Sequence, residues 1–298
     1  MRNFALLALA LALLLARPVL AADPRPIQPN PIPPSTSQPT TSVAALTYST
    51  YVAGLNVFNA EADVELGAAG YRVDLASRTA GTYGALFRGE TNSVAQGRWA
   101  GPMVAPIRYA IAGQWRGRKR MTLIEYAAGQ PSVLRLQPPN DAEREEVPPP
   151  LQRETIDTIS AVAMLVRNTS TSGRCEGQAR TFDGRRLIQV AVRTAGWETV
   201  PADRRSIFAG PALRCDFDGR LLAGFMLDGD RDSAARPQEG TAWLAQLAPG
   251  GPMLPVRVRF DMRWLGSATM YLTGASNNGP LVRTRADAVN GAAPLHLP

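Results

Sequence analysis

Apolar and polar residues alternate along most of the chain between residues 45 and 275. In the segment 70–81, for example, Tyr71, Val73 and Leu75 are separated by Arg72 and Asp74. A period of two places successive side chains on opposite faces, so such segments predict half-buried antiparallel β-strands bounded by Gly, Pro or Asn turns. The predicted strands are LTYSTYVAG (46–54), LNVFNAEADVEL (55–66), GYRVDLASRTAG (70–81), PIRYAIAGQW (106–115), RMTLIEYA (120–127), RLIQVAVRTA (186–195), GTAWLAQLA (240–248), LPVRVRFDMRW (254–264) and ATMYLTG (268–274).

One stretch has a different period, PPPLQRETIDTISAVAMLVRN at residues 148–168. Its three prolines prevent a strand from continuing, and Thr155 or Asp157 can cap the free amides of a helix start. The apolar residues of the stretch recur every three to four positions, which predicts a helix with one apolar face. These residues are Ile156, Ile159, Ala163 and Val166.

About ten strands and one helix predict a mainly β fold, in which a large curved antiparallel sheet, a sandwich or a barrel fills a domain at residues 45–275. The apolar face of a large sheet must be shielded from water, and the single helix is long enough to pack against it. We therefore expect the helix to lie against the concave face, where it forms either permanent core or the lid of an apolar cavity.

The chain ends have other compositions. Residues 1–22 carry Arg2, an apolar run and small residues near the end, as in a secretory signal peptide, so we expect an exported, periplasmic protein. No later segment is apolar enough to span a membrane. Residues 23–44 are rich in Pro, Ser and Thr and predict a disordered linker, either a plain tether or a proline-motif ligand. Residues 276–298 predict a flexible tail.

The chain contains two cysteines, Cys175 and Cys215. An oxidising compartment favours their pairing, and closing this loop would stabilise the fold by about 4 kcal/mol in the chain-entropy model. Buried free thiols are the alternative. A redox-active pair is disfavoured because the two residues lack Cys-x-x-Cys spacing.

The net charge is +7, and removal of Arg2 and Arg17 with the signal peptide leaves +5. The cluster RGRKR at 116–120 invites a nucleic-acid or anionic-lipid interpretation. No stacking aromatic residues or binding motif accompany it, so a solvated strand end is favoured and no nucleic-acid partner is expected.

The sequence offers few candidate catalytic residues. The one histidine, His296, lies in the predicted tail, which removes a Ser-His-Asp triad, a Cys-His nucleophile and a His-rich zinc site. Asp157 and Ser160 stand three apart, where helix capping is the commoner reason for both. We expect no catalytic residues, no cofactor and no metal.

Two groups of acidic residues leave alternatives open. Carboxylates on the second and third predicted strands could meet across the sheet as in a glycoside hydrolase, although alternating charges normally mark a solvated face. They are Glu61, Asp63, Glu65 and Asp74. The loop LDGDRDSAARPQEG places Asp228, Asp230, Asp232 and Glu239 at calcium-loop positions. Ser233 stands where that turn needs glycine, which favours an acidic hairpin loop.

Several motifs resemble the bacterial family called domain of unknown function 3108. ETIDTISAVAMLVR is similar to its Leu-Asp-Pro-x-Ser-Ala-x-x-x-x-x-Arg segment, with Asp157, Ser160, Ala161 and Arg167 matching and Thr158 replacing proline. CEGQARTFDGRRLIQVAV, YSTYVAGLNVFNAEADVEL and LPVRVRF resemble further strands of the family, and the similarity spans 46–273.

The resemblance implies an exported envelope protein with a curved antiparallel sheet, a covering helix and no established catalytic residues. Its shape would resemble the half-barrel of periplasmic carriers that hold lipoprotein acyl chains, although fold analogy does not transmit function. The favoured interpretation is a non-catalytic envelope protein that binds an apolar or lipid-like ligand, or an envelope protein partner, between sheet and helix. The alternative is a carboxylate-based hydrolase acting on an envelope polymer.

Overall fold

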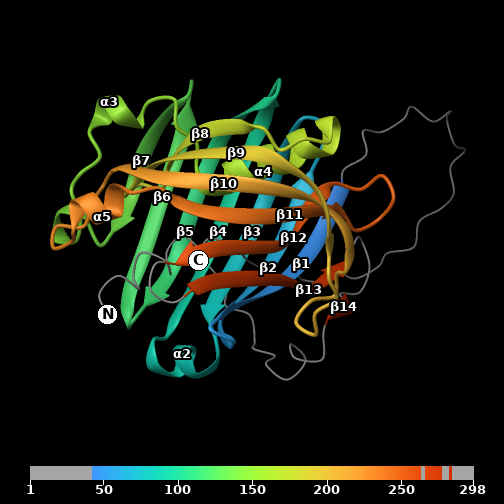
Figure 1. The fold of residues 1–298 in the computed structure, drawn as a ribbon. Helices are drawn as coiled ribbons and strands as arrows, with labels where there is room; N and C mark the ends of the chain where they lie inside the picture. Colours follow the sequence, from blue (N-terminus) through green and yellow to red (C-terminus); the bar gives the residue numbers. More distant parts are fainter. Residues whose placement is uncertain (1–41, 263–265, 277–281, 284–298) are drawn as a thin grey trace, which may run out of the picture.

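The computed structural model describes residues 42–262, 266–276 and 282–283. Within them, one antiparallel sheet has the strand order β7-β6-β5-β4-β3-β2-β1-β13-β12-β11-β10-β9-β8, and β14 pairs with β13 (Figure 1). The mainly β prediction, with a large curved antiparallel sheet, is confirmed. The strands are β1 (Ser42–Val52), β2 (Leu55–Leu66), β3 (Gly70–Thr79), β4 (Gly89–Ala100), β5 (Met103–Trp115), β6 (Arg118–Ala127), β7 (Gln130–Gln137), β8 (Gly177–Phe182), β9 (Leu187–Val200), β10 (Gly210–Ala223), β11 (Gln238–Gln246), β12 (Met253–Met262), β13 (Gly266–Ser276) and β14 (Val282–Arg283).

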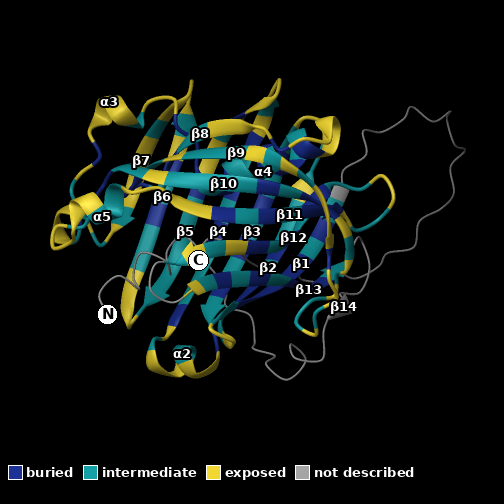
Figure 2. Ribbon diagram, viewed as in Figure 1, coloured by how far each residue is buried: buried dark blue, intermediate teal, exposed yellow. Residues whose placement is uncertain are grey.

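The sheet bends over itself. Figure 1 shows β8 to β13 lying across β2 to β7, and the long pairing of β1 with β13 joins the two halves. Residues that alternate along each strand therefore face the enclosed side in both halves. Buried segments occur on strands of both halves (Figure 2). Tyr71, Val73 and Leu75 of β3 and Met270 and Leu272 of β13 are buried members of one apolar core.

The helical stretch is divided. A single turn, α3 (Pro149–Gln152), is followed by five residues of other conformation and then by α4 (Thr158–Ser172), which packs against β3, β4, β5, β8 and β12. The remaining helices in the described part are short: α2 (Gly81–Leu86), α5 (Arg231–Ala235) and the 3₁₀ turn η1 (Asn140–Ala142). None of the described helices is long and apolar enough to cross a membrane.

Ile156 is not on the helix, contrary to the periodicity argument. Its amide donates to Arg180 O and its carbonyl accepts from the amide of Phe182, so it forms a parallel bridge with β8. Strand β8 is an end of the sheet, and this bridge covers part of its edge, which would otherwise present unpaired backbone groups.

The predicted domain limits differ slightly from the strand limits. Strand β1 begins at Ser42, within the predicted linker, and β14 lies within the predicted tail. The predicted signal peptide and the linker up to residue 41 lie outside the described residues, as does most of the tail.

Cys175 and Cys215 are joined in a disulfide with a Cα–Cα distance of 5.9 Å. The bond connects the segment after α4 to β10, and both cysteines are fully buried. It therefore ties the end of the helix to the sheet that the helix covers.

Candidate ligand-binding region at helix α4

A buried chain of hydrogen bonds marks the start of α4. Asp157 is the N-cap, and its Oδ1 accepts from the Ser160 amide at 2.8 Å while its Oδ2 accepts from Ser160 Oγ at 2.5 Å. Tyr71 of β3 donates its hydroxyl proton to Ser160 Oγ at 2.6 Å. The structure thus gives Asp157 and Ser160 the capping roles that the sequence suggests, and it links them to the sheet.

Burial is the main cause of the pKa shifts in this chain of hydrogen bonds. Asp157 and Ser160 are 0% exposed, and burial raises the pKa of Asp157 from 3.8 to about 6, although its hydrogen bonds with Ser160 and backbone amides oppose the shift. Burial and the nearby Asp157 charge raise the pKa of Tyr71 and of Tyr126. Both tyrosines therefore remain neutral hydrogen-bonding groups across the physiological range.

The hydroxyl of Tyr126 is a buried polar group that makes no hydrogen bond within the described part of the chain. Tyr126 lies on β6, where burial is the main cause of its raised pKa and the Asp157 charge adds to it. Because an unsatisfied buried hydroxyl costs roughly 1–3 kcal/mol, this oxygen is a natural contact for a bound water or ligand.

The far end of α4 is held by the sheet. Arg167 Nη1 donates to Gly101 O at 2.6 Å, and its guanidinium lies 4.6 Å from the ring centre of Trp99. Asn168 Nδ2 donates to Pro102 O at 2.8 Å, and Ser170 Oγ accepts from the Met253 amide at 2.8 Å. Together with the disulfide, these contacts make α4 a fixed element.

The predicted apolar face of α4 lies in the core. Ile159, Ala163 and Val166 are at most 4% exposed and belong to the same cluster of buried residues as the sheet interior. Ile156 joins this cluster from its bridge to β8. The four residues therefore share one apolar core, and their role in lining a ligand site remains a prediction.

Exposed apolar residues lie on β7 and α3. Val133 of β7 stands opposite Ile124 of β6, which is 0% exposed, and Leu134 is the extra residue at the adjoining β-bulge. Val133 is 37% and Leu134 54% exposed, and Leu151 of α3 is 40% exposed. The hairpin between β6 and β7 touches the segment before α4, because Gly129 O accepts from the Glu154 amide at 3.2 Å.

The predicted carboxylate pair forms only in part. Asp63 of β2 stands opposite Asp74 of β3, but Asp74 is held by Arg72, whose Nη2 donates to Asp74 Oδ1 at 2.6 Å. Their neighbours Ala62 and Val73 face the core, so the carboxylates lie on the outer face of the sheet. This arrangement is the solvated face that the sequence favoured.

The acidic loop forms a helix start. Asp230 is the N-cap of α5 and accepts from the Ser233 amide at 3.0 Å, and Glu239 lies in β11. No group of three or more His, Cys, Asp or Glu side chains suited to a metal ion occurs in the described ranges.

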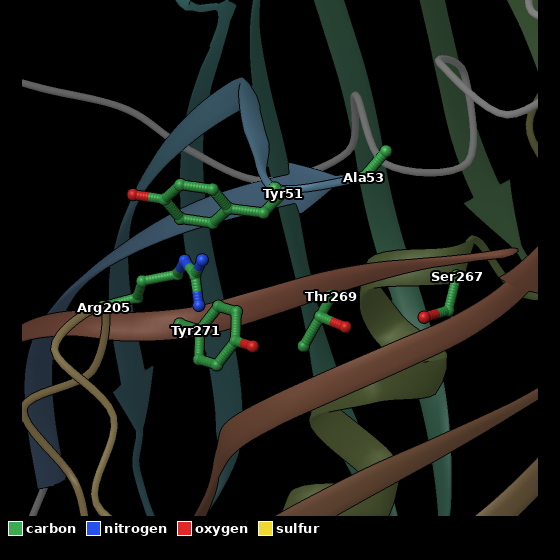
Figure 3. Close-up of a pocket in the computed structure, with 7 residues that line it drawn as sticks. Tyr51, Ala53, Arg205, Ser267, Thr269 and Tyr271 are labelled. Atoms are coloured by element: carbon green, nitrogen blue, oxygen red, sulfur yellow. The ribbon is translucent and has the colours of Figure 1, made fainter. Parts of the chain in front are cut away.

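A surface pocket lies elsewhere, on the outer face of β1 and β13 (Figure 3). Its volume is about 250 Å³, and its lining includes Tyr51, Arg205 and Tyr271. The sequence pattern does not point to these residues, because Arg205 comes from the β9–β10 loop and is distant in sequence from both strands.

A family described as "Protein of unknown function (DUF3108)" matches residues 47–273. The chain belongs to the DUF3108 family. This confirms the resemblance noted in the sequence. No curated protein matches the chain.

Comparison with solved structures gives two matches to this DUF3108 protein. A β-barrel-like protein of domain of unknown function DUF1849 from Brucella abortus has 11% identity and a TM-score of 0.48, with 80% of this chain and 99% of that chain covered. A candidate lipoprotein from Parabacteroides distasonis ATCC 8503 has 10% identity and a TM-score of 0.32, with 80% and 97% covered.

The DUF3108-like motif FDGRR, residues 182–186, forms the tight turn between β8 and β9. Asp183 accepts from the amides of Arg185 and Arg186 and from the Arg186 guanidinium, whose Nη2 lies 2.6 Å from Asp183 Oδ2. Burial alone would raise the pKa of Asp183, but the Arg186 charge and these hydrogen bonds outweigh burial and lower it. The motif therefore builds a buried ion pair instead of a reactive group.

The same turn closes the two ends of the bent sheet against each other. Arg185 Nη2 donates to Pro138 O at 2.6 Å, and Asn140 Nδ2 donates to Gly184 O at 3.2 Å, so the turn contacts the segment that follows β7. Gly184 has a φ of +86°, and a Cβ there would lie 2.8 Å from Thr122 Cγ2. A glycine is required by both the turn and this close approach.

Proposed function

We propose that the protein is an exported, non-catalytic binding protein of the cell envelope that holds an apolar or lipid-like ligand at β7 and α3, where the β6–β7 turn contacts the segment before α4. A protein partner with an apolar segment would use the same surface. The observation that carries the proposal is the set of exposed apolar side chains at this place, Val133, Leu134 and Leu151.

The neighbouring interior supplies a polar contact for such a ligand. The buried hydroxyl of Tyr126 makes no hydrogen bond to the rest of the described chain, and Asp157, Ser160 and Tyr71 form a hydrogen-bonded chain nearby. A ligand with an apolar body and one polar group would match an apolar rim with a few convergent polar atoms.

Export is supported by two independent features. Residues 1–22 have the composition of a secretory signal peptide. The disulfide between Cys175 and Cys215 is of the kind that persists in oxidising compartments such as the periplasm.

The test uses protein purified from its own envelope and analysed by native mass spectrometry, followed by titration with a fluorescent apolar probe. We expect a lipid-sized mass on the protein, and we expect Leu134→Ser to weaken probe binding several-fold. Leu86→Ser is the matched control. It removes the same apolar side chain at another place, because Leu86 lies on α2 and is 71% exposed.

Absence of any copurifying apolar mass, together with equal probe binding by both variants, would refute the proposal. Copurification of a protein instead of a lipid, lost in Leu134→Ser alone, would assign the surface to a protein partner.

A further inference from the structure

The outer-face pocket at β1 and β13 combines features of a site for an anion. Its lining consists of Tyr51, Ala53, Gly54, Arg205, Ser267, Thr269 and Tyr271 (Figure 3). Ala268, Met270 and Leu272 of β13 are buried in the core side of the sheet. Because side chains alternate along a strand, Ser267, Thr269 and Tyr271 face outward.

Arg205 is held over this pocket by its loop. The Ile207 amide donates to Leu272 O at 2.9 Å, and Ser206 Oγ donates to the same oxygen at 3.2 Å, which ties the loop to β13. The Arg205 guanidinium carbon lies 5.1 Å from the ring centre of Tyr51 and 6.0 Å from that of Tyr271. Both distances lie in the range of cation–π attraction, so the rings orient the guanidinium before any ligand arrives.

The guanidinium of Arg205 keeps its hydrogen-bonding capacity. It forms an ion pair with Asp203, whose Oδ2 lies 3.5 Å from Arg205 Nη1. The other oxygen, Asp203 Oδ1, accepts from the Arg205 backbone amide at 2.9 Å. Asp203 therefore fixes the loop backbone, and within the described residues no hydrogen bond occupies the Arg205 guanidinium.

A second arginine adds positive charge next to the pocket. Arg257 of β12 stands directly opposite Tyr271, and its guanidinium carbon lies 5.1 Å from that ring centre. Its Nη2 donates to Pro201 O at 3.4 Å, and its buried Nε makes no hydrogen bond to the part of the chain that is described. Two guanidinium groups thus adjoin Tyr271, while Asp203 is the carboxylate paired with one of them.

We propose that this pocket binds the phosphate group of a phosphate ester. A guanidinium edge matches two phosphate oxygens, and the hydroxyls of Ser267 and Thr269 supply donors from another side. Donors on several sides suit the tetrahedral phosphate better than a planar carboxylate. A volume of about 250 Å³ also leaves room for the esterified group, which the tyrosine rings can contact.

The phosphate can belong to a soluble ester or to a phospholipid headgroup, and one experiment separates the two. The mature full-length protein is titrated with glycerol 3-phosphate by calorimetry and, in parallel, sedimented with vesicles of phosphatidylglycerol. The variants are Arg205→Gln and the matched control Arg174→Gln, which removes the same charge at a side chain that is 68% exposed on another surface.

We expect saturable binding that Arg205→Gln weakens at least tenfold and Arg174→Gln leaves unchanged. Binding of glycerol 3-phosphate assigns a soluble ester, and binding of vesicles alone assigns a headgroup. No saturable binding of either probe, or an equal loss in both variants, would overturn the proposal. The outcome is independent of the apolar-ligand proposal, whose test variant Leu134→Ser leaves this pocket intact.

Discussion

The buried carboxyl group of Asp157 should give the protein a distinctive dependence of stability on pH. Its pKa is raised from 3.8 to about 6, so the folded protein binds this proton more tightly than the unfolded chain does. The stabilisation is therefore fully present below pH 3.8 and is lost as the pH rises through about 6. The full effect is about 3 kcal/mol, of which about 2 kcal/mol falls between about pH 4.5 and 7.5.

Asp157→Asn removes the titration but keeps a capping oxygen for the Ser160 amide. The assay is urea unfolding followed by tryptophan fluorescence, with the disulfide intact, at several values between about pH 4.5 and 7.5. We expect the free energy of unfolding of the wild type, minus that of Asp157→Asn, to fall by about 2 kcal/mol across this range. Using the difference cancels the contributions of Glu143 and Asp183, whose lowered pKa values act in the opposite direction at lower pH.

Asp230→Asn is the matched control, because Asp230 is also an N-cap but is exposed. It should lower stability slightly or not at all and leave the pH profile as in the wild type. A flat difference curve for Asp157→Asn, or one that rises with pH, would refute the reasoning.

Two further predictions concern the attachment of α4. Ile159→Asp should unfold the domain, because Ile159 is 2% exposed and an unpaired buried charge costs several kcal/mol. The readout is loss of the cooperative thermal transition. A folded variant with weakened apolar-probe binding would instead identify α4 as a lid. Cys175 and Cys215 should resist alkylation in the unreduced protein and react after reduction under denaturing conditions, with mass spectrometry as the readout; full labelling without reductant would contradict the disulfide.

The sequence by itself determined most of the strands, because alternation with a period of two survives wherever one face is apolar and the other polar. All nine strands predicted from this pattern form. The pattern did not predict β4, β7, β8, β10 or β14. For β4 the reason is that its inward positions are small, since Ser93, Ala95 and Gly97 replace the usual large apolar residues. A Cβ at Gly97 would lie 2.5 Å from the Tyr71 hydroxyl, so the space is taken by a residue of the neighbouring strand.

The helix shows the same division between local and tertiary causes. The Asp157 cap and the apolar spacing of Ile159, Ala163 and Val166 are local signals, and both predict the helix from the sequence alone. Ile156 fits the same spacing, yet its backbone pairs with β8, because the open edge of a sheet offers hydrogen bonds that a local pattern cannot reveal. The helix therefore begins after Asp157 instead of before it.

The candidate sites depended still more on the tertiary structure. The sequence located Asp157 and Ser160 and paired the cysteines, but it could not show that Tyr71 would complete the buried chain of hydrogen bonds. It could not bring Arg205 over Tyr51 and Tyr271 either, since those contacts join segments more than 60 residues apart. Periodicity reports which face a side chain occupies, whereas only the bending and pairing of the sheet decides which side chains share that face.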